Sequence, residues 1–279
     1  MNSESDIQKE GQIFSFRLLL VHDNVARKAL LRLSIKRYIK MSRRRFLPAL
    51  LTLLCLLTLA TLLYTGIIWP NTLFASSYHV QGLDVSSYQQ QIDWKSVTQT
   101  GKYSFVFIKA TEGKNFKDAF FQANWRETKE QGLLRGAYHF YSADRTGTEQ
   151  ANNYISMVPK DVGMLPPVLD LEVCGKDHQV MLHEIKVFLD LLEQHYGMKP
   201  IIYTDYDRYA EYIKGNFADY AIWIRDVLMP ANWSTIKNWT FWQYDSRGHI
   251  PGITGFVDIN VFSGARNQLN ELANPLKQK

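Results

Sequence analysis

Residues 168–173 read Val-Leu-Asp-Leu-Glu-Val and decide the fold class of this chain. A short apolar run of this kind, introduced here by Pro166-Pro167, is typical of a strand that is buried on both faces. Similar runs recur along the chain, with helical patterns between most of them. The runs that we predict as strands are 79–85, 105–110, 134–141, 168–173, 201–204, 221–225, 240–244 and 257–262.

The predicted helices become scarce toward the C-terminus. They cover residues 94–100, 118–131, 148–158, 180–196 and 208–214. Strands that alternate with helices predict parallel pairing and right-handed crossovers. Eight strands suggest a barrel, although about 195 residues are fewer than the ~250 of a full (β/α)₈ barrel. We therefore predict an α/β fold, a reduced and flattened TIM-like barrel of about eight strands with few C-terminal helices. Its active site should lie at the C-terminal ends of the strands.

Four acidic residues stand at the ends of predicted strands. Asp84 closes the first strand, Asp170 and Glu172 close the fourth, and Asp258 begins the last. Asp170 and Glu172 share one face because strand side chains alternate, and two residues along a strand span ~6.6 Å. Two carboxyls that face one cavity cannot both ionise freely, so the pKa of one is raised and it can donate a proton.

Cleavage of a glycosidic bond needs such an acid, together with a carboxylate for the developing cation. The alternative is that these acids are solvated residues at strand ends. For Asp-x-Glu in an otherwise apolar run we favour function, because burial without a purpose would be costly.

Aromatic residues at the strand ends are candidates for contacts with sugar rings. Tyr138 lies on the third strand, Trp223 on the sixth, and Trp242, Gln243 and Tyr244 on the seventh. Flat rings suit sugar faces, and amides and hydroxyls suit sugar hydroxyls; packing in the barrel core is the alternative role for each ring. The sequence contains no His-Glu-x-x-His motif and too few Cys residues for a zinc site, so we predict neither a metal nor a cofactor.

Residues 46–69 carry no charge and are long enough to span a bilayer. Basic residues precede this run, so the positive-inside rule places the N-terminus in the cytoplasm and the body outside it, in the periplasm. A signal peptide cleaved near Ala75–Ser77, which would release a secreted enzyme, is the alternative. The predicted segments are a basic cytoplasmic tail at 1–45, a transmembrane signal-anchor at 46–69, a linker at 70–78, a catalytic domain at 79–272 and a C-terminal tail at 273–279.

The start of the chain is open to two interpretations. Residues from Met41 onward look like the start of an export signal, so Met41 is one candidate for the initiator. In the other interpretation, residues 1–40 form a disordered cytoplasmic tail.

The charge distribution excludes one further class of function, and the cysteine content bears on disulfides. The net charge of +5 arises in residues 1–45, which carry +7, whereas the remainder carries −2. The body therefore lacks the basic surface that nucleic-acid binding needs. We predict no disulfide between Cys55 and Cys174, and we interpret Cys174 as a packed thiol.

These motifs together resemble glycoside hydrolase family 25, the Chalaropsis-type lysozymes, over residues 80–272. The stretches that carry the resemblance are GLDVSSYQQQIDW, FVFIKATEG, GLLRGAYHFY, PVLDLE, KPIIYT, FWQY and VDINVF. The resemblance implies a flattened β/α barrel that hydrolyses the β-1,4 bond from N-acetylmuramic acid to N-acetylglucosamine in peptidoglycan.

Carried over by motif, Glu172 matches the general acid of the family. Asp170 matches the neighbouring carboxylate that orients the acetamido group of the substrate or stabilises the cation. Asp84 and Asp258 match the other acids of the cleft, and Tyr138 matches a tyrosine on the substrate side. The resemblance leaves open whether a protein carboxylate or the substrate's own acetamido group is the nucleophile.

One stretch departs from the pattern. After Trp223 many relatives carry a small residue and then Tyr, whereas this chain has Ile224-Arg225-Asp226, which leaves the local subsite open. The expected partners are peptidoglycan strands and a lipid bilayer, and nothing predicts an oligomer rather than a monomer. The competing hypotheses are an inactive peptidoglycan-binding module and a glycosidase that acts on another N-acetylated glycan such as chitin.

Overall fold

The computed structural model describes residues 4–234 and 236–273, with side chains from residue 24 onward except at 41–45. The chain divides into two compact units, Met1–Tyr64 and Thr65–Lys279, which are described separately.

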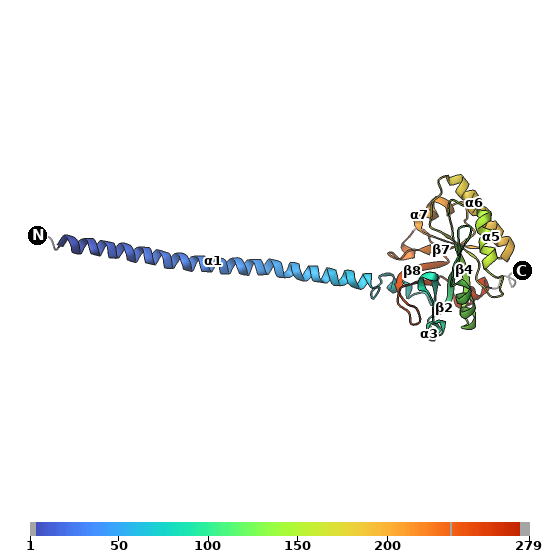
Figure 1. Ribbon diagram of the computed structural model, residues 1–279, viewed down its shortest axis with the longest axis horizontal. Coiled ribbons are helices and arrows are strands. Elements are labelled where there is room, and N and C mark those ends of the chain that lie inside the picture. Colours follow the sequence, from blue (N-terminus) through green and yellow to red (C-terminus); the bar gives the residue numbers. More distant parts are fainter. Residues whose placement is uncertain (1–3, 235, 274–279) are drawn as a thin grey trace. The chain divides into compact units, whose positions relative to one another are not determined.

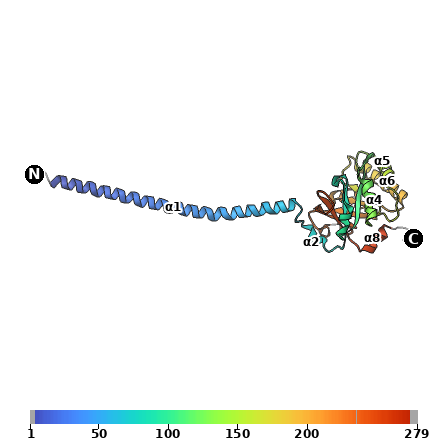
Figure 2. The ribbon, with the colours of Figure 1, turned by 60° about the horizontal axis from the view of Figure 1, so that its bottom comes forward.

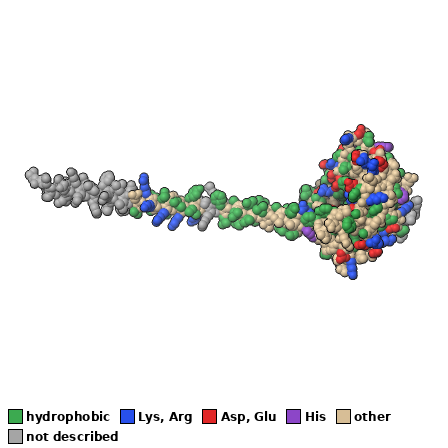
Figure 3. Space-filling view, viewed as in Figure 1, with side chains coloured by type: hydrophobic (Ala, Val, Ile, Leu, Met, Phe, Trp, Pro, Cys, Tyr) green, Lys and Arg blue, Asp and Glu red, His purple; other side chains and the backbone are tan. Residues whose placement is uncertain are grey.

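The first unit is one helix, α1 (Glu4–Tyr64). Its segment Phe46–Tyr64 is long and apolar enough to cross a membrane, judged by length and composition. Figure 3 shows this apolar segment in green, preceded by blue basic side chains. The helix ends at Tyr64, whereas the predicted transmembrane segment extends to Trp69. Residues 4–40, for which a disordered tail was one of two interpretations, are helical, because they are rich in good helix formers and contain a single glycine and no proline.

The second unit is built around a closed sheet (Figure 1). In its described residues the strands follow the order β1-β9-β8-β7-β6-β5-β4-β2-β3, and β1 also pairs with β2. All strands except the short β3 therefore close into an eight-stranded barrel, which confirms the predicted fold class. The strands are β1 (Val80–Val85), β2 (Tyr103–Glu112), β3 (Phe116–Lys117), β4 (Leu134–Phe140), β5 (Val168–Leu171), β6 (Ile201–Thr204), β7 (Ala221–Arg225), β8 (Phe241–Gly248) and β9 (Val257–Phe262).

Helices follow the early strands, as predicted. They are the short α3 (Trp94–Gln99) and the longer α4 (Phe121–Glu130), α5 (Gly147–Met157) and α6 (His178–Tyr196). After β6 the described chain again has only short helical pieces: α7 (Tyr206–Arg208), a π-turn at Tyr209–Ile213, a 3₁₀ turn at Ala231–Trp233 and α8 (Arg266–Leu272). Figure 1 shows α5 and α6 outside the strands, and Figure 2 shows α8 at the lower edge of the unit, away from α5 and α6.

The direction of β9 differs from the predicted parallel pairing. It runs antiparallel to both of its neighbours, β1 and β8, whereas the other barrel pairs are parallel. The loop from Gly248 to Val257 contains no helix, and an antiparallel pair is the kind that a short connection can join. As a result, the first residues of β9 lie at the same end of the barrel as the last residues of the parallel strands.

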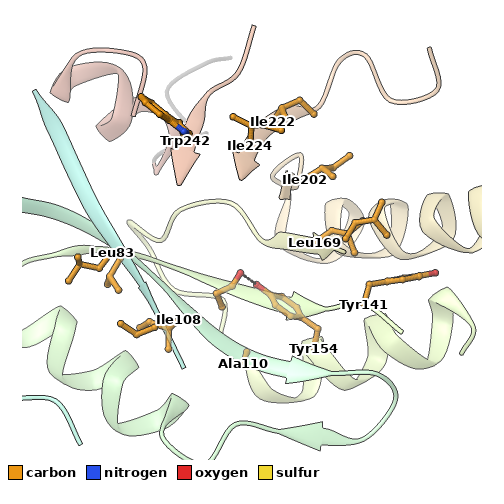
Figure 4. Packing of buried hydrophobic residues seen from close by; sticks show 14 of the residues in the cluster. Leu83, Ile108, Ala110, Tyr141, Tyr154, Leu169, Ile202, Ile222, Ile224 and Trp242 are labelled. Atoms are coloured by element: carbon orange, nitrogen blue, oxygen red, sulfur yellow. Dashed lines mark hydrogen bonds between the residues drawn. The ribbon is translucent and has the colours of Figure 1, made fainter. Parts of the chain in front are cut away.

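Strand alternation divides the core into an interior and an outer layer. Figure 4 shows the outer layer, where Leu83, Ile108 and Leu169 pack among the helices. The interior is filled by aromatic and aliphatic side chains, and α8 adds Leu269 to it. These interior residues are Val80, Phe105, Phe107, Leu165, Val168, Ile201, Tyr203, Trp223, Phe241, Phe262, Leu269 and Ala273.

Two strand glycines make room for this filling. A Cβ atom added to Gly82 would lie 2.4 Å from the ring of Phe105, and one added to Gly136 would lie 2.6 Å from the ring of Phe107. The barrel is therefore packed and is not a pore, so no ligand can bind inside it.

The segment predicted as a linker is part of the folded unit. It forms α2 (Asn71–Ala75), and the buried Asn71 amide donates hydrogen bonds to the carbonyl oxygens of Asp226 at 2.9 Å and Met229 at 3.2 Å. Trp69 Nε1 donates to the carbonyl oxygen of Tyr244 at 2.7 Å. The linker prediction was wrong because these side chains find partners on the barrel. Of the predicted C-terminal tail, residues 274–279 lie outside the described residues.

Candidate active site

The predicted acids meet at one end of the barrel. Asp84, near the end of β1, is the direct cross-strand partner of Asp258, near the start of β9. Asp170 is on β5, and Glu172 follows the last residue of that strand. The charge of Glu172 acts on Asp84, Asp170 and Asp258 alike. We call this end of the barrel, with its four acids, the mouth.

The acids of the mouth differ in exposure. Asp84 and Asp170 are each 8% exposed, whereas the Glu172 side chain is 33% exposed because it lies beyond the strand. Glu172 is therefore the more accessible member of the Asp-x-Glu pair, and Asp170 lies beneath it in the wall.

A network of hydrogen bonds fixes Asp84. Its Oδ2 atom accepts from Asn260 Nδ2 at 2.7 Å and from Gln243 Nε2 at 3.2 Å. Each amide oxygen is engaged in turn: Tyr203 Oη donates to Gln243 Oε1 at 2.7 Å, and Trp223 Nε1 donates to Asn260 Oδ1 at 2.8 Å. Side chains from five strands thus form one network around Oδ2 of Asp84, and the hydrogen bonds to the two amide oxygens fix both amides with their N–H groups toward that atom.

Burial changes the proton affinity of the acids. It raises the pKa of Asp84 from the usual 3.8 to about 7. It also raises the pKa of Asp170 well above its usual value, with further increases from the charges of Glu172 and Asp84. The pKa of Asp258 is raised in the same way, by burial and then by Asp84. Asp170 Oδ1 is buried and makes no hydrogen bond within the described chain, so a protonated form is favoured there.

Tyr138, on β4, lies close to the same acids. Burial raises the pKa of its hydroxyl well above 10.0, and the charges of Asp84, Asp170 and Asp258 raise it further. The phenol therefore stays protonated at neutral pH and can donate a hydrogen bond. The indole of Trp223 lies deeper, stacked on Phe107 with ring centroids 4.6 Å apart, where it supports Asn260.

Two of the predicted sugar-binding residues do not reach the mouth. Trp242 and Tyr244 are 1% and 2% exposed and belong to the outer core, where Trp242 Nε1 donates to the carbonyl oxygen of Asp226 at 2.8 Å. Gln243 faces the interior, so strand alternation turns both of its neighbours outward. We therefore leave Trp242 and Tyr244 out of the proposed site.

The mouth also contains residues that we did not predict. Tyr203 and Asn260 hold Gln243 and Asp84, and Lys109 acts on the charge of Asp170. Asn260 carried a usable signal, since it is a polar residue two positions after Asp258 on a buried strand. Arg225, at the end of β7, places its Nε atom 3.8 Å from Glu172 Oε1.

No metal site appears among the described residues, in which three or more His, Cys, Asp or Glu side chains nowhere form a suitable group. Cys55 and Cys174 are both free and exposed. The predicted packing of Cys174 was wrong, because the chain leaves the sheet after β5; its Sγ atom lies 3.4 Å from Glu211 Oε2.

Comparison with known proteins agrees with the fold. Residues 83–253 match the family model described as glycosyl hydrolases family 25. The chain belongs to that family. It is accordingly a glycoside hydrolase. Asp258 and Asn260 lie beyond the matched residues, so their place in the site rests on the geometry of β9.

Relatives of this family 25 hydrolase include lysozyme M1 of Streptomyces globisporus, which is 34% identical over 72% of this chain and 73% of its own length. A family 25 glycosyl hydrolase from Bacillus anthracis is similar in structure, with a TM-score of 0.65 and 38% identity over 70% of this chain and 94% of that one. The bacterial lysozyme of Streptomyces coelicolor has a TM-score of 0.63 and 35% identity over 70% and 97% of the two chains.

Proposed function

We propose that this family 25 hydrolase is a muramidase that cleaves the β-1,4 bond from N-acetylmuramic acid to N-acetylglucosamine in peptidoglycan. The observation that carries the proposal is the mouth itself, where four carboxyls converge on one end of a packed barrel. Its similarity to lysozymes from two Streptomyces species supports the choice of substrate.

In this proposal Glu172 is the general acid. A proton donor must come within hydrogen-bond distance of the leaving oxygen of a polymeric substrate, and Glu172 is the member of the Asp-x-Glu pair that extends beyond its strand.

Asp170 would act on the sugar that loses the bond. Its raised pKa allows it to hold a proton in the free enzyme. Positive charge that develops on the sugar during cleavage favours the ionised form of a nearby carboxyl, so the same group can stabilise that charge. As a carboxylate, it can also accept the N–H of the acetamido group.

Asp84 and Asp258 would complete the negative field around the developing cation. The amides of Asn260 and Gln243 fix the Asp84 carboxylate before substrate binds, so little reorganisation is needed during the reaction. Tyr138, with its protonated hydroxyl among these acids, is suited to donate to a sugar oxygen or to the nucleophile.

The test is product analysis with peptidoglycan as substrate. Products are reduced with borohydride and the reduced sugar is identified by mass spectrometry. We expect reduced muramic acid from the wild-type chain and none from Glu172→Gln. Glu130→Gln, on the exposed surface of α4, is the matched control and should retain full activity. Reduced glucosamine would show cleavage of the other bond, and full activity of Glu172→Gln would exclude its role as the acid.

We further propose that the segment Phe46–Tyr64 remains in the mature protein as a single membrane anchor, with the barrel on the periplasmic side. Cleavage near Ala75–Ser77 would remove Trp69 and Asn71, whose side chains hydrogen-bond to the barrel. This loss argues against a cleaved signal peptide.

Cell fractionation tests the anchor. We expect the full-length chain in the membrane fraction, resistant to extraction with alkaline carbonate. A chain of lower mass in the soluble fraction, with a new N-terminus near Ser76, would contradict the anchor without affecting the proposed enzymatic activity.

A further inference from the structure

Two basic side chains of the described residues lie close enough to the acids of the mouth to influence their charge. Lys109 acts on Asp170, and Arg225 acts on Asp84 and Asp258. Lys109 is already engaged, since its Nζ atom lies 2.7 Å from Glu112 Oε2 and 5.0 Å from the centre of the Phe140 ring.

Arg225 is held much more loosely. Its side chain is 44% exposed, and its contact with Glu172 is 3.8 Å long, which is too long for a hydrogen bond. Within the described part of the chain its guanidinium donates no hydrogen bond. Its five N–H donors are therefore available to a ligand. A planar guanidinium is the protein group best matched to a carboxylate, to which it donates two parallel hydrogen bonds.

The position of Arg225 identifies where that carboxylate would lie. In the proposed reaction Glu172 contacts the scissile oxygen, so the neighbouring guanidinium lies near the two sugars that this bond joins. On a peptidoglycan strand one of the two is muramic acid, whose lactyl ether ends in a carboxyl group. A strand of N-acetylglucosamine alone carries no such group.

The other acids of the mouth oppose an anionic ligand only weakly. Burial raises the pKa values of Asp84, Asp170 and Asp258, so these groups carry less negative charge at neutral pH than exposed acids would. Near Arg225, a substrate carboxylate would therefore be repelled by less than three full negative charges from these acids.

We propose that Arg225 binds a carboxylate of the substrate on its muramic acid side and thereby selects acidic over neutral N-acetylated glycans. The inference rests on the proposed function, because it takes peptidoglycan as the substrate. The carboxylate has two sources. In a strand without peptides it is the lactyl group, whereas in a strand with peptides the lactyl group is an amide and the carboxylate belongs to the stem peptide.

The experiment compares soluble strands of three kinds with the full-length chain in detergent micelles. One strand is free of peptide, one is the same strand with its carboxylates methyl-esterified, and one carries stem peptides. The variants are Arg225→Ala and Arg225→Lys. Arg126→Ala, an exposed arginine on α4 that pairs with Glu127, is the matched control. Circular dichroism checks that each variant is folded.

We expect Arg225→Ala to raise KM for the peptide-free strand about tenfold or more, with little change in kcat or for the esterified strand. Arg225→Lys should recover only part of the loss, because lysine keeps the charge without the planar fork. A rise confined to the peptide-bearing strand also supports the proposal and assigns the carboxylate to the stem peptide. An equal effect on charged and neutral strands, or none on either, overturns it.

The two proposals fail in different ways. A wild-type chain that cleaves none of the strands contradicts the muramidase reaction. Calorimetric binding of the peptide-free and esterified strands then still tests Arg225, since a carboxylate-specific loss of affinity in Arg225→Ala does not depend on turnover. Equal affinities of wild type and variant for both strands would overturn the role of Arg225.

Discussion

Substitution of Asp84 by Asn tests whether burial stores electrostatic strain at the mouth. Because the pKa of Asp84 is raised from 3.8 to about 7, the folded state holds a proton that the unfolded state releases. The contribution of Asp84 to stability is therefore complete below pH 3.8 and is lost as the pH rises through about 7. At about 1.4 kcal/mol for each pH unit, the loss amounts to about 4 kcal/mol.

Asn at position 84 removes the titration and keeps the hydrogen bonds. Its amide oxygen has two lone pairs, which can accept from Asn260 and Gln243 as the carboxylate does. We expect the free energy of unfolding of Asp84→Asn, relative to wild type, to increase by about 4 kcal/mol between pH 4 and pH 8. The proposed negative field at the mouth would weaken at the same time, so enzymatic activity should fall while stability at pH 8 rises.

Urea denaturation followed by tryptophan fluorescence measures this difference. All 7 tryptophans lie at or after Trp69, so the full-length chain in detergent reports on the barrel alone. Asp219→Asn is the control, since that exposed carboxyl pairs with Lys199, which lowers its pKa and moves its titration below this pH range. A relative stability of Asp84→Asn that stays constant from pH 4 to pH 8 would refute the reasoning.

Three further predictions concern the rest of the barrel. Burial lowers the pKa of His139 from 6.5 to about 4, so the free energy of unfolding of wild type should fall by about 3 kcal/mol as the pH falls through this range. His139→Asn, compared by the same urea assay, should lack that loss. The same dependence of unfolding free energy on pH in both proteins would contradict the prediction. Gly82→Ala places a Cβ atom 2.4 Å from the Phe105 ring and should destabilise the barrel by about 1–3 kcal/mol, measured by the urea midpoint. Gly163→Ala is the control, because its Cβ atom meets open space and only the smaller strain of the positive φ remains. Trp223→Phe removes the hydrogen bond to Asn260 and should lower kcat. Trp242→Phe, in the outer core, should lower stability more than kcat. The reverse pattern in steady-state assays would show that Trp242 belongs to the active site.

Much of the fold followed from local pattern. The bounds of β6, β7 and β9 agree with the predicted runs, because short apolar stretches between turns leave little freedom in where a buried strand begins and ends. The direction of β9 did not follow. A run such as VDINVF has the same pattern in either direction, and the neighbours that fix its orientation are far away in sequence.

The site was predictable where chemistry and position coincide. Asp84, Asp170 and Asp258 are acids in buried strands, which is a costly arrangement that calls for an explanation. Trp242 was assigned to the mouth by its position near a strand end, and alternation turned it outward. Tyr203 was hidden in an ordinary apolar run, because its importance depends on a hydrogen bond to Gln243, 40 residues away.

The reversed strand β9 also has a consequence for biosynthesis. It forms two ladders of the barrel at once, with β1 and β8, and it supplies Asp258 and Asn260, the latter bonded to Asp84 at a separation of 176 residues. A chain emerging from the ribosome therefore lacks both a closed barrel and a complete set of acids until this late segment has been made. Products of translation that end before β9 would therefore lack both the closed barrel and the complete mouth on which the proposed hydrolysis depends.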